Sequence, residues 1–264
     1  MARPTPESYY YSGQGQVVIG ERNANGKMIN AYAVGNCTAL EIQVAVEKIE
    51  HKESMTGNRA IDKVLVTEKN ATFNVTMESL NLRNLMLAFW GSVTANAAGT
   101  VTGETHTAKP GSIVALDHPG VGTVTVMYDE AGTPTALPEA EYTLDPEFGT
   151  ITIHDDSTTI EAAGTELTIG YKYADSETLH ALTEVTQPER FVRFEGLNTL
   201  DGSSVLVEIP RAAFEPLQSM ALINEDFANV PMTGNILQDN TITTGSKYYR
   251  QTVLKADWAT TLTP

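Results

Sequence analysis

The chain has 264 residues, of which 41% are hydrophobic and 19% charged, so its composition is that of a globular protein and not of a disordered one. Its 33 acidic and 17 basic residues give a formal net charge of -16. Such a surface repels free nucleic acid and anionic membranes, which disfavours DNA binding through a basic patch.

The single cysteine and the short apolar runs limit the possible covalent cross-links, metal sites and membrane segments. Cys37 is the only cysteine, so neither an intrachain disulfide nor a thiolate metal cluster can form. The N-terminal stretch MARPTPESYYYSGQG lacks the apolar core of a signal peptide. The most apolar helical run, LNLRNLMLAFW, is too short to span a bilayer and is interrupted by Arg83. We therefore expect a soluble protein that is assembled in the cytoplasm.

The first predicted elements are strands of an antiparallel sheet with one wet face. An Asn-Gly pair within residues 23–27 is typical of a tight turn. From Thr38 to Val46 apolar and polar residues alternate, and the alternation resumes at 64–66 and 73–75. One face of the first strand carries Leu40, Ile42, Val44 and Val46. The other carries Glu41, Gln43 and Glu47.

A long charged segment, His51–Lys63, separates the strand at 38–46 from the one that resumes at 64. A tight hairpin needs only about two to five loop residues, so this segment exceeds what chain reversal requires. Two interpretations remain open. The segment is either a solvated hairpin tip or a contact with another copy of the chain.

The periodicity then changes to that of a helix. In MESLNLRNLMLAFWG the apolar residues Leu82, Leu85, Met86 and Phe89 share one face. Ser79 is the expected N-cap, and Gly91 is the expected glycine just past the end of the helix. We expect a helix of about three turns that packs against the sheet.

Residues 96–179 have a different composition. They hold most of the acidic excess, and Lys109 and Lys172 are their only basic residues. Short apolar alternations separated by turn residues occur at 123–128, 142–144, 150–153 and 167–173. This pattern predicts a small β-sandwich, inserted as a separate domain into a discontinuous domain of residues 1–95 and 180–264.

After the insertion the alternation of apolar and polar residues seen before residue 78 resumes. The run RFVRFEGLNTLDGSSVLVEIP predicts two strands joined by an Asp201-Gly202 turn. The segment FEPLQSMALINEDF is compatible with either a helix or extended chain. The segments GNILQD and YYRQTVLKADW predict terminal strands that close the sheet.

Motifs that would carry chemistry are sparse. The SGQGQ stretch at Ser12–Gln16 has no strand before it and no helix after it, so it is read as a turn and not as a phosphate loop. His154, Asp155 and Asp156 could hold a divalent ion, but a turn explains them more simply, as it does the Asp117-His118 pair. The sequence contains no nucleophile elbow, metalloprotease helix or kinase motif. We expect no enzymatic activity and no cofactor.

The run Tyr9-Tyr10-Tyr11 leaves two interpretations open. One is a terminal strand with a single buried tyrosine, and the other is an anchor against a neighbouring subunit.

The order of the elements outside the insertion resembles the major tail tube proteins of long-tailed, non-contractile bacteriophages. The best-matching pieces are Glu78–Gly91 and Phe194–Leu217, and the resemblance extends over residues 1–95 and 180–264. Residues 96–179 resemble the immunoglobulin-like domains that decorate phage tails.

The resemblance implies a β-sandwich or barrel with one flanking helix and a role as a structural virion protein. Six copies would join through their sheet edges into a ring with a continuous inner β-barrel, and stacked rings would form a helical tube for genome delivery. The implied partners are the chain itself, the tape measure protein, the tail terminator and the distal tail protein. Viral DNA would pass through without sequence-specific binding, and no membrane is involved.

The resemblance also implies roles for particular residues. It assigns the stacking of rings to a loop composed of His51, Lys52, Glu53, Ser54, Met55, Thr56, Gly57, Asn58 and Arg59. For the lumen we expect the wet face of Glu41, Gln43 and Glu47, because basic side chains on that wall would bind phosphate and slow the DNA. The acidic insertion is expected on the outside of the tube, with weak adhesion to the host surface as its role.

A rival hypothesis is a carbohydrate-binding or adhesin-like β protein. In that case the two tryptophans, Trp90 and Trp258, would matter most. The position of Trp90 at the end of the predicted helix favours core packing instead.

Overall fold

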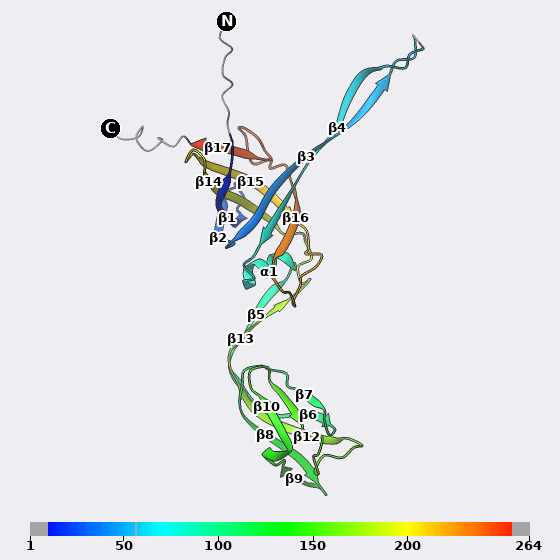
Figure 1. Ribbon diagram of the computed structural model, residues 1–264, viewed down its shortest axis with the longest axis vertical. Coiled ribbons are helices and arrows are strands. Elements are labelled where there is room, and N and C mark those ends of the chain that lie inside the picture. Colours follow the sequence, from blue (N-terminus) through cyan, green and yellow to red (C-terminus); the bar gives the residue numbers. More distant parts are fainter. Residues whose placement is uncertain (1–9, 56, 255–264) are drawn as a thin grey trace, which may run out of the picture. The chain divides into compact units, whose positions relative to one another are not determined.

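The structure is a computed structural model that describes residues 10–55 and 57–254. Within these residues the chain is mainly β with one α-helix, which confirms the predicted fold class (Figure 1). It divides into two compact units. Unit 2 is Val93–Thr178, and unit 1 comprises the described residues up to Ser92 and from Leu179 onward. The predicted boundaries, at residues 96 and 179, lie close to these.

Unit 1 is built on one antiparallel sheet with the strand order β2-β1-β14-β15-β16-β4-β3, and β17 also pairs with β15. The strands are β1 (Gly13–Arg22), β2 (Met28–Ala33), β3 (Cys37–Lys52), β4 (Ile61–Met77), β14 (Glu189–Asn198), β15 (Ser204–Phe214), β16 (Val230–Ile236) and β17 (Arg250–Leu254). The predicted strand at 38–46 is thus only part of β3, and the separate alternations at 64–66 and 73–75 belong to one strand, β4.

The sheet folds over on itself because two different strands, β17 and β16, pair with β15 on the edge opposite β14. Its first half, Ser204–Glu208, pairs with β17, and its last residues, Ala212–Phe214, pair with β16. Residues from distant strands, such as Ile19 of β1 and Phe73 of β4, therefore share one buried core. Phe73 meets Phe214 edge to face, with ring centroids 4.9 Å apart.

The sheet does not close into a barrel within the single chain. Its end strands are β2 and β3, and within the described residues each has one edge without a strand partner. The segment GNILQD was predicted to form a strand that closes the sheet. Its strand residues belong to β16, which lies inside the sheet between β15 and β4.

The helix α1 spans Leu82–Ala88, which is about two turns and not three. Asn81, and not Ser79, is the N-cap, because the Asn81 side chain accepts a hydrogen bond from the Asn84 backbone N–H at 2.9 Å. The fully buried residues of the helix are Asn84, Leu87 and Ala88, and of the four apolar residues predicted to share its packing face, Leu85 packs against the core.

The helix ends in a left-handed residue that is not a glycine. Trp90 has φ +47°, and the Gly91 N–H bonds the Met86 carbonyl at 2.9 Å, as in a Schellman motif. Gly91 is needed for another reason. A Cβ at this position would lie 2.4 Å from the His180 carbonyl oxygen of the returning chain.

Unit 2 is a small sandwich of two antiparallel sheets around one core. One sheet has the order β6-β12-β8-β9 and the other β10-β11-β7. The strands are β6 (Gly99–Ala108), β7 (Ile113–Ala115), β8 (Val121–Glu130), β9 (Thr133–Ala136), β10 (Tyr142–Asp145), β11 (Thr150–Ile153) and β12 (Thr165–Tyr173), with a 3-10 turn η1 (Glu139–Glu141). Ile151 and Ile169, one from each sheet, belong to the same buried cluster. The sequence pattern did not indicate β6, β7 or β9.

The strand that leads into unit 2 pairs with the strand that leads out of it. These are β5 (Ser92–Asn96) and β13 (Ser176–His180), which form a separate two-stranded sheet. Deleting unit 2 would therefore leave two neighbouring chain ends that a short turn can join.

Candidate assembly surfaces

The long hairpin of β3 and β4 extends beyond the rest of the unit 1 sheet (Figure 1). β16 pairs with β4 only over Thr72–Met77, so further along the hairpin the two strands have only each other. The described residues between 44 and 70 are exposed along both strands. We call residues 44–70 the arm. An isolated two-stranded ribbon is at best marginally stable in water, so the arm is a candidate for stabilisation by a partner.

The arm carries apolar side chains that nothing in the described chain covers. Val44 is 74% exposed, and the cross-strand pair Ile49 and Leu65 is exposed on both sides. The exposed large apolar residues of the arm are Val44, Val46, Ile49, Met55, Ile61, Val64, Leu65 and Val66. A long edge strand with this much exposed apolar surface is an unusual feature for a monomer and typical of a protein-protein contact.

The far end of the arm contains the residues predicted to stack rings. His51 and Lys52 belong to β3, and the turn proper is residues 53–60, of which Thr56 lies outside the described residues. The turn includes Ser54, Met55 and Asn58. Two of its residues, Gly57 and Arg59, have positive φ angles. We call residues 51–63 the arm tip.

Two carboxylates of the arm tip have contacts within the tip. The Asp62 carboxylate lies 2.6 Å from His51 Nδ1, and Glu53 accepts a hydrogen bond from the Met55 backbone N–H at 2.8 Å. Within the described chain, no ion pair is formed by the cations of the tip, which are Lys52, Arg59 and Lys63. The tip therefore presents unpaired positive charge beside exposed apolar surface.

The residues predicted for the lumen lie on one face of the sheet. Glu41 pairs with Asn74, Gln43 with Thr72 and Glu47 with Glu68, so all three β3 residues project on the side opposite the buried Phe73 and Val75. The same face continues onto β16. Its members there and on the body of the hairpin are Glu41, Gln43, Thr72, Asn74, Thr76, Thr233 and Asn235. None of these is basic, and we call this set the polar face.

A groove of about 910 Å³ opens between the start of β3 and the strands β1, β14, β15 and β17. Its lining includes Leu40, Phe194 and Val207, and none of the lining residues is charged. Burial raises the pKa of the Cys37 thiol, at the rim, to about 11. The Cys37 thiol is therefore not activated as a nucleophile.

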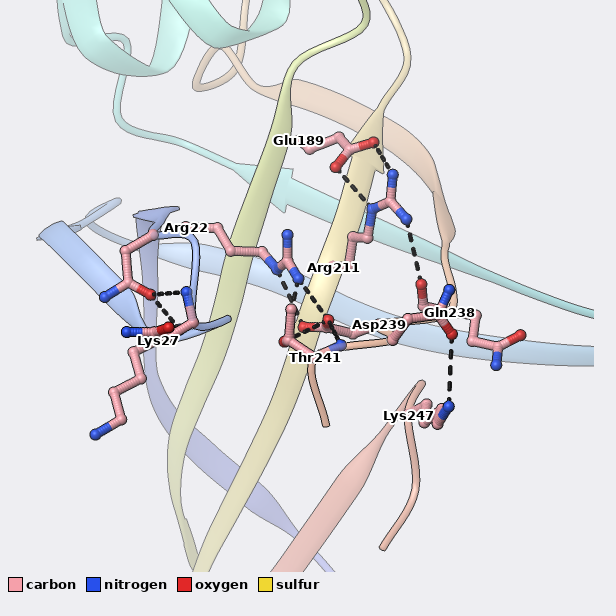
Figure 2. A network of polar contacts seen from close by, with 11 residues as sticks. Arg22, Lys27, Glu189, Arg211, Gln238, Asp239, Thr241 and Lys247 are labelled. Carbon is pink, nitrogen blue, oxygen red and sulfur yellow. Dashed lines mark hydrogen bonds and ion pairs between the residues drawn. The ribbon is translucent and has the colours of Figure 1, made fainter. Parts of the chain in front are cut away.

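The most buried ionic network of unit 1 is shown in Figure 2. Asp239, whose side chain is 0% exposed, pairs with the Arg22 guanidinium and also accepts hydrogen bonds from the Thr241 N–H at 2.9 Å and hydroxyl at 2.6 Å. Beside it, Arg211 donates two bonds of 2.7 Å to Glu189 in a bidentate pair. Residues up to 217 positions apart are joined in this way, and no local sequence signal indicates the pairing.

The network is structural in character. Burial opposes ionisation of Asp239, but hydrogen bonds from Arg22 and Thr241 outweigh it and hold the pKa of this carboxyl at about 2. The hydrogen bonds from Arg211 likewise lower the pKa of Glu189. Because both carboxylates are engaged by cations of the same unit, the network fixes the turn after β1 against the segment that follows β16.

Unit 2 has its own polar cluster around Glu104. Tyr171 donates to one carboxylate oxygen of Glu104, and His106 Nε2 lies 2.5 Å from the other. His118 contacts the Tyr171 hydroxyl at 3.1 Å and stacks on Tyr173. Burial raises the pKa of Glu104, but the bonds from Tyr171 and His106 outweigh it and leave that pKa below its usual value. The Tyr171–Glu104 bond joins β12 to β6 within unit 2.

The other candidates from the sequence are dispersed. His154 contacts the Thr143 hydroxyl at 2.8 Å and the Ala140 carbonyl at 2.9 Å. Across residues 10–55 and 57–254, no three His, Cys, Asp or Glu side chains gather as metal ligands, and no helix has the length and apolar character to cross a membrane. Tyr10 and Tyr11 are exposed, whereas Tyr9 lies outside the described residues.

The rival carbohydrate hypothesis gains no support from the tryptophans. Trp90 is half-buried, and its indole Nε1 is enclosed without a hydrogen-bond acceptor in the described chain. Trp258 lies outside the described residues.

Comparison with known proteins places the chain in a family. A family model described as "Protein of unknown function UCP028589" matches residues 10–252, so the chain belongs to this family. No curated protein matches the chain.

Proposed function

We propose that this member of the family is a structural virion protein that forms the tail tube of a long-tailed, non-contractile bacteriophage. In this proposal six copies form a ring, the rings stack into a helical tube, and the tube conducts the genome into the host. The protein has no catalytic role, and its functional form is the polymer.

The arm is the single observation that carries the proposal. A two-stranded ribbon with exposed apolar residues on both strands is stabilised only when something covers it. A second copy of the chain is the partner that a repetitive tube supplies, and the arm offers it a long contact: the nine β3 residues 44–52 alone span roughly 30 Å.

Two further features fit a ring. The free edges of β2 and β3 allow copies to pair edge to edge, which would continue the sheet from one copy to the next. The polar face without basic residues suits a channel wall, because DNA phosphates would find no cation there to bind.

Unit 2 is accommodated on the outside of such a tube. It carries only two basic residues, Lys109 and Lys172, and its acidic surface favours separation from neighbouring copies. The tape measure protein, the tail terminator and the distal tail protein are the proposed partners of the assembled tube.

The test is assembly in the electron microscope. Purified protein at increasing concentration should form rings or hollow tubes in negative stain. Deleting residues 54–58 should leave a folded protein with an unchanged circular dichroism spectrum that no longer forms tubes. A control insertion of five Gly and Ser residues between Ala131 and Gly132, in an exposed turn of unit 2, should leave tube formation intact.

Two different results would count against the role of the arm tip and against the proposed function. Tubes of normal length from the 54–58 deletion would show that the arm tip is not the stacking element. A wild-type protein that stays monomeric at every concentration, with its arm mobile in solution, would contradict the proposed function.

A further inference from the structure

Exposed apolar side chains also occur on unit 1 in two segments that contain neither helix nor strand. The first precedes β16 and the second precedes β14. Ile223 is 96% exposed and Phe227 91% exposed. The exposed large apolar residues of the two segments are Leu182, Val185, Leu222, Ile223 and Phe227. We call this surface, together with its acidic neighbours Glu184, Glu225 and Asp226, the base patch.

Both segments are held in place by the end of α1. The backbone N–H of Leu217 donates to the Ala88 carbonyl at 2.8 Å, and that of Leu182 donates to the Phe89 carbonyl at 2.9 Å. The Glu184 N–H donates to the Trp90 carbonyl at 3.0 Å. The carbonyls that a helix leaves unpaired at its C-terminus therefore hold Leu217 of one segment and Leu182 and Glu184 of the other at the same helix end.

The base patch and the arm tip lie at opposite ends of the same hairpin. Met77 pairs with Cys37 at the near end of the hairpin and also with Val230, which directly follows the segment of Phe227. Lys52 pairs with Ile61 at the far end. Fifteen residue steps along β3 separate the two ends by roughly 50 Å.

The charges of the two surfaces are complementary. Residues 181–188 and 216–229 contain no Lys or Arg, and within the described chain Glu184, Glu225 and Asp226 form no ion pair. The arm tip offers the reverse arrangement, in which Lys52, Arg59 and Lys63 are unpaired while its carboxylates already have contacts. Exposed apolar residues lie beside the charges on both surfaces, including Met55 on the tip.

We infer that the base patch is the docking surface for the arm tip of a second copy of this chain. The inference rests on the proposed function and identifies the partner surface of the arm within it. Apolar contact supplies the affinity, and the cation-carboxylate pairs set register and exclude wrong pairings. Because the two surfaces differ and lie at opposite ends, the contact is head to tail and does not close on itself, so it extends into a filament.

Charge reversal tests the inference. One variant reverses the base patch (Glu225→Lys and Asp226→Lys), and a second reverses the tip (Lys52→Glu and Arg59→Glu). Each should raise the critical concentration for polymerisation roughly a hundredfold, because it places like charges against each other. A matched control, Glu161→Lys with Glu166→Lys in unit 2, changes the net charge equally and should polymerise like the wild type.

A rescue experiment decides whether the two surfaces contact each other. Mixing the two reversed variants, or combining all four substitutions in one chain, restores opposite charges across the contact and should restore polymers. Normal polymerisation of the base variant, or failure of rescue when each variant is folded by circular dichroism, would overturn the docking assignment while leaving the tube proposal intact. A wild-type protein that does not polymerise would contradict the proposed function and this inference together.

Discussion

Replacing Asp239 with asparagine should destabilise unit 1 strongly, and by an amount that depends on pH. The Asp239 side chain is fully buried, and its partner Arg22 is only 19% exposed. The asparagine keeps an oxygen that can accept from Thr241, but it leaves the Arg22 guanidinium without a counter-charge in a place where water reaches it poorly.

The magnitude follows from two independent arguments. Removing one partner of a buried ion pair costs about 3–5 kcal/mol of the free energy of unfolding. The lowering of the Asp239 pKa from 3.8 to about 2 corresponds to about 2.5 kcal/mol of stabilisation by the ionised form. We therefore expect a loss of about 3 kcal/mol at pH 7.

The direction in which the Asp239 pKa is shifted determines how the free energy of unfolding depends on pH. Because the folded protein lowers the pKa of Asp239, the stabilisation is complete above about pH 5 and is lost as the pH falls toward 2. By pH 3 about 1 kcal/mol of it should be gone. The difference in unfolding free energy between wild type and Asp239→Asn should narrow by that amount between pH 7 and pH 3.

Urea unfolding followed by tryptophan fluorescence measures this difference. Both tryptophans, Trp90 and Trp258, lie outside the sequence of unit 2, so the signal reports on the other part of the chain. The matched control is Glu195→Gln, which removes a carboxylate from the more exposed pair with Arg193 and should cost less than about 1 kcal/mol. A variant Asp239→Asn within 0.5 kcal/mol of the wild type (about a twofold change in the unfolding equilibrium), or a difference that does not change with pH, would refute the reasoning.

Three other predictions concern the core, the polar face and unit 2. Phe73→Ala should lower the unfolding free energy by about 4 kcal/mol, because it removes a fully buried ring packed on Phe214, whereas Leu200→Ala at an exposed site of unit 1 should be nearly neutral in the same urea titration. Gln43→Lys should leave tubes intact but make them bind short duplex DNA in a salt-dependent manner in a sedimentation assay, and equal binding by wild-type tubes would argue against the polar face as the lumen. Removing residues 97–175 and joining β5 to β13 with a short Gly-Ser turn should spare tube formation, and loss of tubes in micrographs of a folded variant would make unit 2 a structural part of the tube.

The sequence pattern was informative wherever apolar periodicity decides the structure. The alternation from Leu40 to Val46 predicted the strand and the opposite sides on which Leu40 and Glu41 lie, although Val44 and Val46 of the apolar side are exposed on the arm. The change in composition near residue 96 indicated the insertion. These features depend on neighbours in sequence or on a simple period, so they can be read without knowledge of the fold.

The features that sequence reasoning missed depend on long-range contacts or on exposed chain. The charged residues 47–52 and 61–63 were not assigned to strands because polarity on both faces hides the period of two, although cross-strand pairing extends the hairpin through them. The helix cap was misplaced by two residues because Ser79 and Asn81 are equally good capping types.

Among the candidate assembly surfaces, the arm tip was noticed in the sequence and the base patch was not. The charge and length of the segment made the tip residues conspicuous in the sequence, and the resemblance assigned them to ring stacking. Part of the base patch lies in the segment FEPLQSMALINEDF, whose pattern is compatible with either a helix or extended chain. Only the structure reveals that Leu222, Ile223 and Phe227 of this segment are exposed, whereas Leu217 and Met220 pack against the core. The pairing of Arg22 with Asp239 is likewise invisible in the sequence, since 217 residues separate the two.

A cryo-electron microscopy map of the particles that the wild-type protein forms at high concentration would test the central claim most directly. The account predicts a hollow assembly in which residues 44–70 of every copy are covered by another copy and the free edge of β3 is paired or buried. A map in which the arm of each copy stands free in solvent, with the sheet edges left open, would contradict it.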